Sequence, residues 1–325
     1  MTAPQSTFDF VEGFHLAHAI VALKDIGILG AMIEPISVRM LAERFRVDEL
    51  MLLRILQYLS DRTDLVEHLG DQYRTTDNYN THTRFLVDQY IGAYGPNARQ
   101  LIDILRFPQS AGDVVDRRKH ALAFAALEGP SVAILSKIIQ QLELNYVLDL
   151  GCGPGALLFD LSASDQHFVG WGIDSSAEMC AEANARAAQL KVLQRVTIYQ
   201  GDAAHFEKCV PKDVCRQIRT IVASSLLNEF FATDLCTCVE FLRRLRNVFP
   251  GRTLIVSDYY GCLGTSNKPW SRQTILHDFI QVISGQGVPP GNLDTWQTIY
   301  EAAGCELVHS LEAQDATGFI HIVRL

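Results

Sequence analysis

The chain has 325 residues, of which 48% are hydrophobic and 20% charged, and its formal net charge is −9 at pH 7. These values fit a globular protein of two domains with substantial cores. An acidic chain is a poor partner for a phosphate backbone, which excludes nucleic acid as the main ligand. No stretch reaches the roughly 18 apolar residues of a membrane helix, and the first residues lack the pattern of a secretory signal. We therefore expect a cytoplasmic protein with no membrane partner.

The first part of the chain is predicted to be mostly helical. Residues 10–34 carry apolar side chains all around a helix, which is typical of a buried helix. Ser37 and Asp48 are suitable N-caps for two further helices, and residues 65–76 place a Gly-Asp turn between two short strands. Helix, helix and hairpin in this order indicate a winged-helix domain, but the second helix lacks the basic face needed to read DNA. We expect a structural or dimerising module over residues 1–125.

From residue 146 the pattern changes to short runs rich in β-branched residues, separated by amphipathic helices. These runs are YVLDL, HFVGWGID, RVTIYQGD, IRTIVASSLL and RTLIVSDYY. Such alternation predicts βαβ units and a parallel sheet covered on both faces. Two last runs, CELVHSLE and GFIHIVRL, lie almost next to each other and predict a closing antiparallel hairpin. The expected fold class is α/β, with a Rossmann-like sheet of seven strands over residues 126–325.

All eight cysteines lie from Cys152 onward, and none forms a Cys-x-x-Cys pair. A metal centre built on paired cysteines is therefore not indicated. The spacing favours reduced, packed thiols, as in a reducing compartment.

The sharpest motif is VLDLGCGPGALL, residues 147–158, in which a strand runs into a glycine turn and a helix. Gly151, Gly153 and Gly155 permit a tight turn and let a ligand approach without a Cβ in the way. The helix that follows presents free N–H groups at its start. The same letters, with Ala156 at the end, also fit the dinucleotide fingerprint, so NAD is a competing ligand.

Three acids accompany this turn. Asp174 ends the second strand at about the distance expected of an acid that binds ribose hydroxyls. Asp149 stands two residues before the first glycine, where it can orient the loop or meet a ligand ammonium group. Asp202, in QGDA, ends the third strand and can accept from an adenine amino group. The last two acids and the closing hairpin argue against NAD.

Together, DLGCGPG, Asp174 and the GDA of Asp202 resemble the class I S-adenosylmethionine-dependent methyltransferases. The helical first part resembles the dimerisation domain of the small-molecule O-methyltransferase superfamily. The resemblance covers nearly the whole chain and implies S-adenosyl-L-methionine as cofactor, a small-molecule substrate and a homodimer. In that family the glycine loop passes beneath the methionine part of the cofactor. The acid matching Asp174 binds the ribose, and the acid matching Asp202 lies near the adenine.

The methyl acceptor is less clearly indicated. Many related O-methyltransferases carry a His-Asp pair after the fourth strand, with His as the general base on a phenol, whereas this chain has Asn228 and Glu229. Asn cannot take a proton in this pH range, so the usual base is missing. Glu229 can serve as base if burial raises its pKa.

A second cluster follows the fifth strand: Asp258, then His277 and Asp278 on one helix. The lost His-Asp pair and the segment HDF…SGQGVPP resemble the 2-oxo acid C-methyltransferases of secondary metabolism. These methylate the β-carbon of phenylpyruvate, branched 2-oxo acids or 2-oxoarginine on the way to β-methyl amino acids, and some hold a metal. The resemblance implies a divalent or iron ion that stabilises an enolate. His277 is the best ligand candidate, and Asn228, Glu229 and Asp258 are further candidates for ligation or catalysis.

The favoured function is therefore C-methylation of a 2-oxo acid, with 2-oxoarginine as one candidate. The alternative is a small-molecule O-methyltransferase that uses Glu229 or His277 as base. An NAD-dependent oxidoreductase is the more distant alternative.

Overall fold

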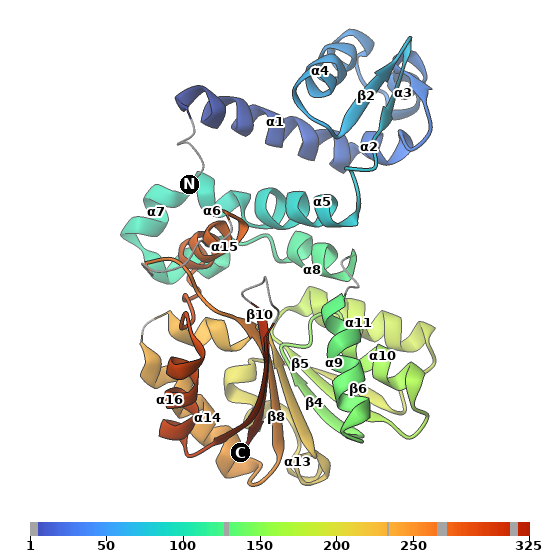
Figure 1. Cartoon of the computed structure of the whole chain (residues 1–325). Helices are drawn as coiled ribbons and strands as arrows, with labels where there is room; N and C mark the ends of the chain where they lie inside the picture. Colours follow the sequence, from blue (N-terminus) through green and yellow to red (C-terminus); the bar gives the residue numbers. More distant parts are fainter. Residues whose placement is uncertain (1–5, 127–129, 233, 265–271, 313–317) are drawn as a thin grey trace. The chain divides into compact units, whose positions relative to one another are not determined.

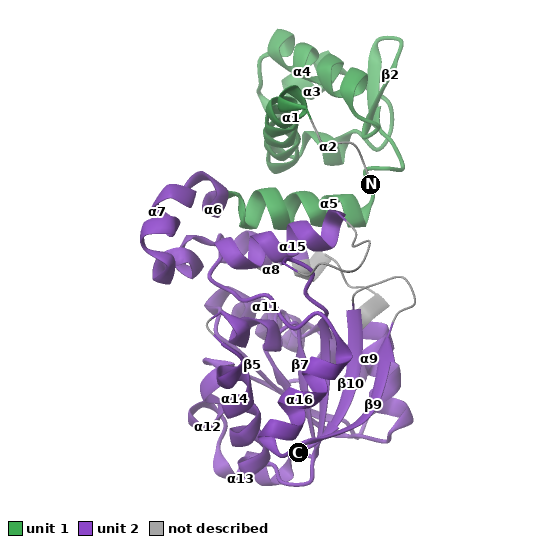
Figure 2. Ribbon diagram, turned by 60° about the vertical axis from the view of Figure 1, so that its left-hand side comes forward, with its two compact units in different colours: residues 1–95 green, residues 96–325 purple. Residues whose placement is uncertain are grey.

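The computed structural model describes residues 6–126, 130–232, 234–264, 272–312 and 318–325. The chain divides into two compact units, residues 1–95 and 96–325 (Figure 2). This boundary lies before residue 126, where the sequence pattern begins the second domain. Asn97 helps to explain the difference, because its buried side-chain amide donates to the carbonyl groups of Ala111 (2.7 Å) and Ile283 (3.0 Å). The segment after residue 95 is thus fastened to the second unit.

The first unit contains the predicted helix pair and hairpin. Its elements are α1 (Thr7–Ile26), α2 (Ile28–Ala31), β1 (Ile36–Ser37), α3 (Val38–Phe45), α4 (Glu49–Arg62), β2 (Val66–Leu69), β3 (Gln72–Thr75), α5 (Thr81–Leu86) and the π-helix η1 (Val87–Ala93). Ser37 and Asp48 cap α3 and α4 as predicted, since each side chain accepts from a backbone N–H three residues on. The strands form a small antiparallel sheet in the order β1-β3-β2.

The sequence predicts a buried first helix, but within a single copy of this chain most of α1 is not buried. Only Ile20 and Leu23 of α1 are buried, while Phe8, Phe10 and Phe14 are 66%, 59% and 56% exposed. A helix that is apolar all round is normally covered all round. The first half of α1 therefore presents an apolar surface.

The second unit is built on a seven-stranded sheet, which confirms the predicted fold class. Its elements are α6 (Gly95–Arg99), α7 (Leu101–Arg106), η2 (Pro108–Val114), α8 (Arg117–Ala126), α9 (Pro130–Gln141), β4 (Tyr146–Leu150), α10 (Ala156–Ser164), β5 (Val169–Asp174), α11 (Ala177–Gln189), β6 (Val196–Gln200), η3 (Ala203–His205), α12 (Phe206–Cys209), α13 (Lys212–Gln217), β7 (Thr220–Ser224), η4 (Leu227–Phe231), α14 (Leu235–Val248), β8 (Thr253–Tyr259), α15 (Arg272–Ile283), α16 (Leu293–Ala303), β9 (Glu306–Glu312) and β10 (Gly318–Arg324). The strand order is β6-β5-β4-β7-β8-β10-β9, and only β9 and β10 run antiparallel to their neighbours.

Helices cover both faces of this sheet (Figure 1). Alternate residues of a strand point to opposite faces. Accordingly, Val147 of β4 packs in one cluster with α9, α10 and α11, whereas Leu148 packs in another with α14 and α16. With both faces covered, the carboxyl edge of the parallel strands is left to form a site.

Strand β10 carries a buried polar group that is fully paired. The ring of His321, which is 0% exposed, contacts the hydroxyl of Tyr300 through Nδ1 (3.0 Å) and that of Tyr260 through Nε2 (3.3 Å). Tyr260 in turn donates to Glu312 at 2.7 Å. Burial lowers the pKa of His321 to about 4, which keeps the ring neutral at pH 7. The closing hairpin is thus joined to α16 and β8 by hydrogen bonds as well as by packing.

None of the helices traced in the described ranges has the length and apolar character needed to cross a bilayer. All eight cysteines are free thiols, as the spacing predicted.

Candidate active site

The glycine turn follows β4 at the carboxyl edge of the sheet. Gly151, Gly153 and Gly155 have φ of 70°, 53° and 78°, a region that residues with a side chain rarely adopt. A Cβ on Gly153 would meet only Met179 Sδ, at 4.0 Å, so the space above this glycine is open. A Cβ on Gly155 would instead lie 2.7 Å from the ring of Phe159. Gly153 therefore leaves room for a ligand, and Gly155 leaves room for the helix that follows.

Asp174, at the end of β5, holds this turn in place. One oxygen of its carboxylate accepts from the N–H of Gly153 and the other from the N–H of Ser176, both at 2.9 Å. Burial raises the pKa of Asp174, and these two hydrogen bonds oppose the rise. The side chain is half-buried, so its remaining lone pairs are open to a hydroxyl donor.

Asp149 and Asp202 lie at two depths of the same edge. Asp149 is buried in β4, and among the described residues no hydrogen bond to its carboxylate is recorded. Burial raises the pKa of Asp149 to about 8, with a further contribution from the charge of Asp174. Asp202 is exposed, follows β6, and caps η3 by accepting from the N–H of Ala204 at 2.8 Å. Asp149 and Asp174 thus lie next to the glycine turn, whereas Asp202 follows β6, two strands away in the sheet.

The turn after β7 contains the predicted Asn228 and is supported by Asp258. The buried carboxylate of Asp258 accepts from the N–H of Asn228 (3.2 Å) and of Tyr259 (2.9 Å). Burial raises the pKa of Asp258 to about 7, and these bonds limit the rise. The side-chain oxygen of Asn228 is buried without a hydrogen-bond partner in the described part of the chain. Asp258 therefore positions the backbone of η4. The side-chain oxygen of Asn228 can still accept a hydrogen bond.

Glu229, also in η4, has the partners expected of an active-site carboxylate. Gln286 donates its amide to Oε1 of Glu229 at 2.6 Å. Desolvation raises the pKa of Glu229, while the guanidinium of Arg117 acts in the opposite direction. The side chain is nevertheless exposed, so water reaches the carboxylate.

Gly287 explains how Gln286 reaches Glu229. A Cβ on Gly287 would overlap the backbone of Phe231 and Ala232. Only glycine therefore lets this segment lie against the end of η4. The N–H of Gln286 also donates to the carbonyl of Gln281 in α15 at 2.9 Å, which joins Glu229 to that helix.

His277 and Asp278 are neighbours on α15 and point to different surroundings, because adjacent residues of a helix face about 100° apart. His277 packs edge-on against the ring of Tyr259 with centroids 4.9 Å apart, and its Nε2 lies 3.1 Å from the amide nitrogen of Gln281. Desolvation lowers the pKa of His277, opposed by the charge of Asp278. The carboxylate of Asp278 is fully buried and accepts from the N–H groups of Cys262 (2.6 Å) and Leu263 (2.8 Å).

The expected metal centre has no support in this geometry. Within the described ranges, no three side chains from His, Cys, Asp and Glu gather closely enough to hold an ion. Both oxygens of the Asp258 carboxylate already accept from backbone N–H groups, and one oxygen of Asp278 accepts from two of them.

Comparison with known proteins indicates the family of the domain that carries this site. Residues 143–298 match a family model described as a methyltransferase domain. The second unit therefore contains a methyltransferase domain. An 80-residue stretch is 38% identical to the uncharacterized protein YjhP of Escherichia coli (strain K12), but it spans only 32% of that protein and 24% of this chain.

Two solved methyltransferases share the fold over nearly their whole length. The mitomycin 7-O-methyltransferase MmcR has a TM-score of 0.73 and 18% identity, covering 97% of this chain and 96% of that one. Human N-acetylserotonin methyltransferase, solved in complex with S-adenosylmethionine, has a TM-score of 0.72 and 15% identity, covering 100% and 99%. This chain therefore shares the fold of these two methyltransferases.

Two residues of the second unit were not predicted as site residues from the sequence. Arg117 lowers the pKa of both Glu229 and Asp174, and Gln286 binds Glu229 directly. Both are far from Glu229 in sequence; Arg117 belongs to no motif, whereas Gln286 lies within the SGQGVPP segment. The one available signal was the glycine-rich SGQG segment, whose Gly287 permits the close approach.

Proposed function

We propose that this chain transfers the methyl group of S-adenosylmethionine to an oxygen atom of a small organic molecule. The observation that carries the proposal is Glu229, a carboxylate beside the glycine turn that stands where related enzymes carry the acid of a His-Asp pair. The O-methyltransferase likeness of the fold supports an oxygen acceptor better than the expected 2-oxo acid carbon. That carbon chemistry also called for a metal, and the described side chains do not assemble a site for one.

The residues present fit the cofactor. The open space above Gly153 admits a ligand close to the backbone, and the half-buried Asp174 offers lone pairs for ribose hydroxyls. Asp149 lies below, suited to a ligand ammonium group, and the exposed Asp202 is suited to an adenine amino group. When bound, S-adenosylmethionine supplies an electrophilic methyl group on a sulfonium.

Glu229 is the group we assign to proton removal. Its raised pKa makes it a stronger base than an ordinary glutamate, and the hydrogen bond from Gln286 fixes its orientation. Glu229 would accept the proton of the acceptor hydroxyl, and the oxygen would then receive the methyl group that bound S-adenosylmethionine would supply. Arg117 limits the rise of the pKa, so that the carboxylate remains ionised over a useful pH range.

The test combines an acceptor panel with a pair of variants. The enzyme is incubated with cofactor labelled in the methyl group and with phenols, other hydroxyl compounds and 2-oxo acids. We expect label on oxygen, and Glu229→Gln should lower kcat about 100-fold with cofactor affinity retained. The exposed Glu240 of α14 provides the control, because Glu240→Gln removes the same charge away from the site.

The pH profile separates Glu229 from His277. Proton removal requires ionised Glu229, so kcat/KM should fall as pH drops through a value above the ordinary range for glutamate. His277→Gln should leave that limb in place. Label found only on the carbon of a 2-oxo acid would contradict the proposal.

A further inference from the structure

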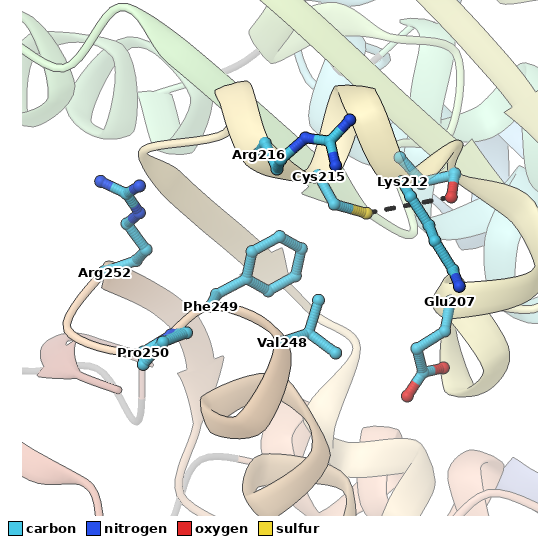
Figure 3. A pocket seen from close by; sticks show the side chains of 9 residues that line it. Glu207, Lys212, Cys215, Arg216, Val248, Phe249, Pro250 and Arg252 are labelled. Atoms are coloured by element: carbon cyan, nitrogen blue, oxygen red, sulfur yellow. Dashed lines mark hydrogen bonds between the residues drawn. The ribbon is translucent and has the colours of Figure 1, made fainter.

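A second cavity lies at the edge of the sheet opposite the glycine turn. Its volume is about 460 Å³, within the range of about 300–1,000 Å³ typical of small-molecule sites. It is formed where β7 and β8 begin, between α13 on one side and the turn from α14 to β8 on the other (Figure 3). The lining residues are Glu207, Val210, Lys212, Cys215, Arg216, Val248, Phe249, Pro250 and Arg252. None of them belongs to the proposed methyl-transfer site.

The floor of this pocket is apolar and fixed by the core. Phe249 is 1% exposed and stacks on Phe206 with ring centroids 5.6 Å apart. Val210, 3% exposed, lies beside it. Cys215 adds a half-buried thiol, which points to the carbonyl oxygen of Val210 at 3.8 Å. An apolar body placed here would meet preformed packing surfaces.

The rim of the pocket is cationic although the chain as a whole is acidic. Lys212, Arg216 and Arg252 come from two separate segments and surround the apolar floor. Among the described residues, no ion pair or hydrogen bond of these three side chains is recorded. The one acid of the lining, Glu207, lies 3.8 Å from Nη1 of Arg244, which partly neutralises it. The lining therefore carries an excess of positive charge.

We propose that this pocket binds a small organic anion: an aromatic or aliphatic body carrying a phosphate or carboxylate group. The body would pack on Phe249 and Val210, and the charged group would bind Arg216, Arg252 and Lys212, since guanidinium groups match these anions with paired N–H donors. The binding would be independent of methyl transfer.

The first test is calorimetry on the full chain with phenyl phosphate, in the presence of saturating S-adenosylhomocysteine. Inorganic phosphate and phenol serve as matched ligands, because each has one half of the required chemistry. We expect saturable binding of phenyl phosphate, with both halves at least about tenfold weaker. Equal binding of inorganic phosphate, equal binding of phenol, or no binding of phenyl phosphate would overturn the proposal.

Variants then locate the site. Arg216→Ala and Arg252→Ala should each weaken phenyl phosphate about five- to tenfold, as expected for partly exposed charge pairs. Glu207→Gln should have the opposite sign and tighten binding, because it removes the one repulsive charge. Arg219→Ala removes an exposed cation just beyond α13 and should leave the affinity unchanged. An equal loss with Arg219→Ala, or no loss with the two pocket variants, would refute this location.

Discussion

Asp149 is an acid inside a hydrophobic strand. It occupies β4 with Leu148 and Leu150 on either side, and the chain buries it without a recorded hydrogen bond from a described residue. Burial raises the pKa of Asp149 to about 8, far above the ordinary value of 3.8. Such a group costs stability whenever it must ionise in the native state. The stability of the fold is thus expected to depend on pH through a residue that lies next to the proposed cofactor site.

This cost has a definite sign with pH. Between about pH 4 and pH 8 the native state binds a proton at Asp149 that the unfolded chain has lost, so the free energy of unfolding falls as pH rises through that window. Asp149→Asn removes this contribution. Relative to the parent, the variant should gain at least about 3 °C in Tm on going from pH 5 to pH 8. Thermal unfolding without cofactor measures it, and the exposed Asp160→Asn serves as control.

A Tm difference that stays the same at both pH values would contradict the assignment. Asp258, whose pKa burial raises to about 7, acts in the same direction. The parent should therefore keep part of its own pH dependence after Asp149 has been replaced.

At the scale of elements, the glycine turn combines two requirements that substitutions can separate. Gly153 and Gly155 both need positive φ, but only Gly155 is crowded, by the ring of Phe159. In Gly153→Ala the new Cβ fits the protein at a backbone cost of about 1–2 kcal/mol, and it enters the space reserved for the ligand. In Gly155→Ala the Cβ must displace a packed aromatic ring.

We therefore predict that Gly153→Ala mainly weakens ligand binding and that Gly155→Ala mainly lowers stability. Gly153→Ala should fold with a small loss of Tm and bind S-adenosylhomocysteine at least about tenfold more weakly. Gly155→Ala should show the larger loss of Tm, about 5 °C or more, since overpacking costs about 1–3 kcal/mol. Calorimetry and thermal unfolding of both variants measure this. Normal affinity in Gly153→Ala would show that the ligand does not approach this glycine.

Elements were more predictable from the sequence than the contacts between them. The alternation of strands and helices from residue 146 indicates the parallel sheet, because burial on both faces requires continuous apolar strands. The N-caps Ser37 and Asp48 each bond to a backbone N–H three residues on, and such local contacts are equally predictable from the sequence. The hydrogen bond between Gln286 and Glu229 joins two segments that are far apart in the sequence, so no periodic pattern of residues predicts it. For Asp258, the sequence does not distinguish a carboxylate that is free to bind a ligand from one that accepts backbone hydrogen bonds in a turn.

The whole molecule is expected to be a homodimer, and we retain this as a proposal. The exposed aromatic side chains in the first half of α1, Phe8, Phe10 and Phe14, support it. Phe10 and Phe14 lie four residues apart on one face of the helix, and exposed apolar side chains grouped in this way are typical of contact surfaces. An identical face on a second copy would bury them with twofold symmetry. The same proposal accounts for a helix whose composition indicates burial all round.

The oligomeric state can be tested by charge at this face. Phe10→Glu combined with Phe14→Glu should convert a dimer to a monomer in light scattering after size exclusion, because paired carboxylates cannot be buried together. Leu193→Glu, at a residue 54% exposed in the second unit, is the control and should remain dimeric. A parent protein of monomer mass, or a double variant of dimer mass, would refute the proposal.

The strand order β8-β10-β9 has a consequence for synthesis on the ribosome. β9 emerges before β10 but pairs with no other strand, so it has no hydrogen-bonded neighbour until residues 318–324 have left the exit tunnel. Until then β8 is an open edge, a state prone to pairing with other nascent chains. The seven-stranded sheet is therefore completed only after residues 318–324 have been translated.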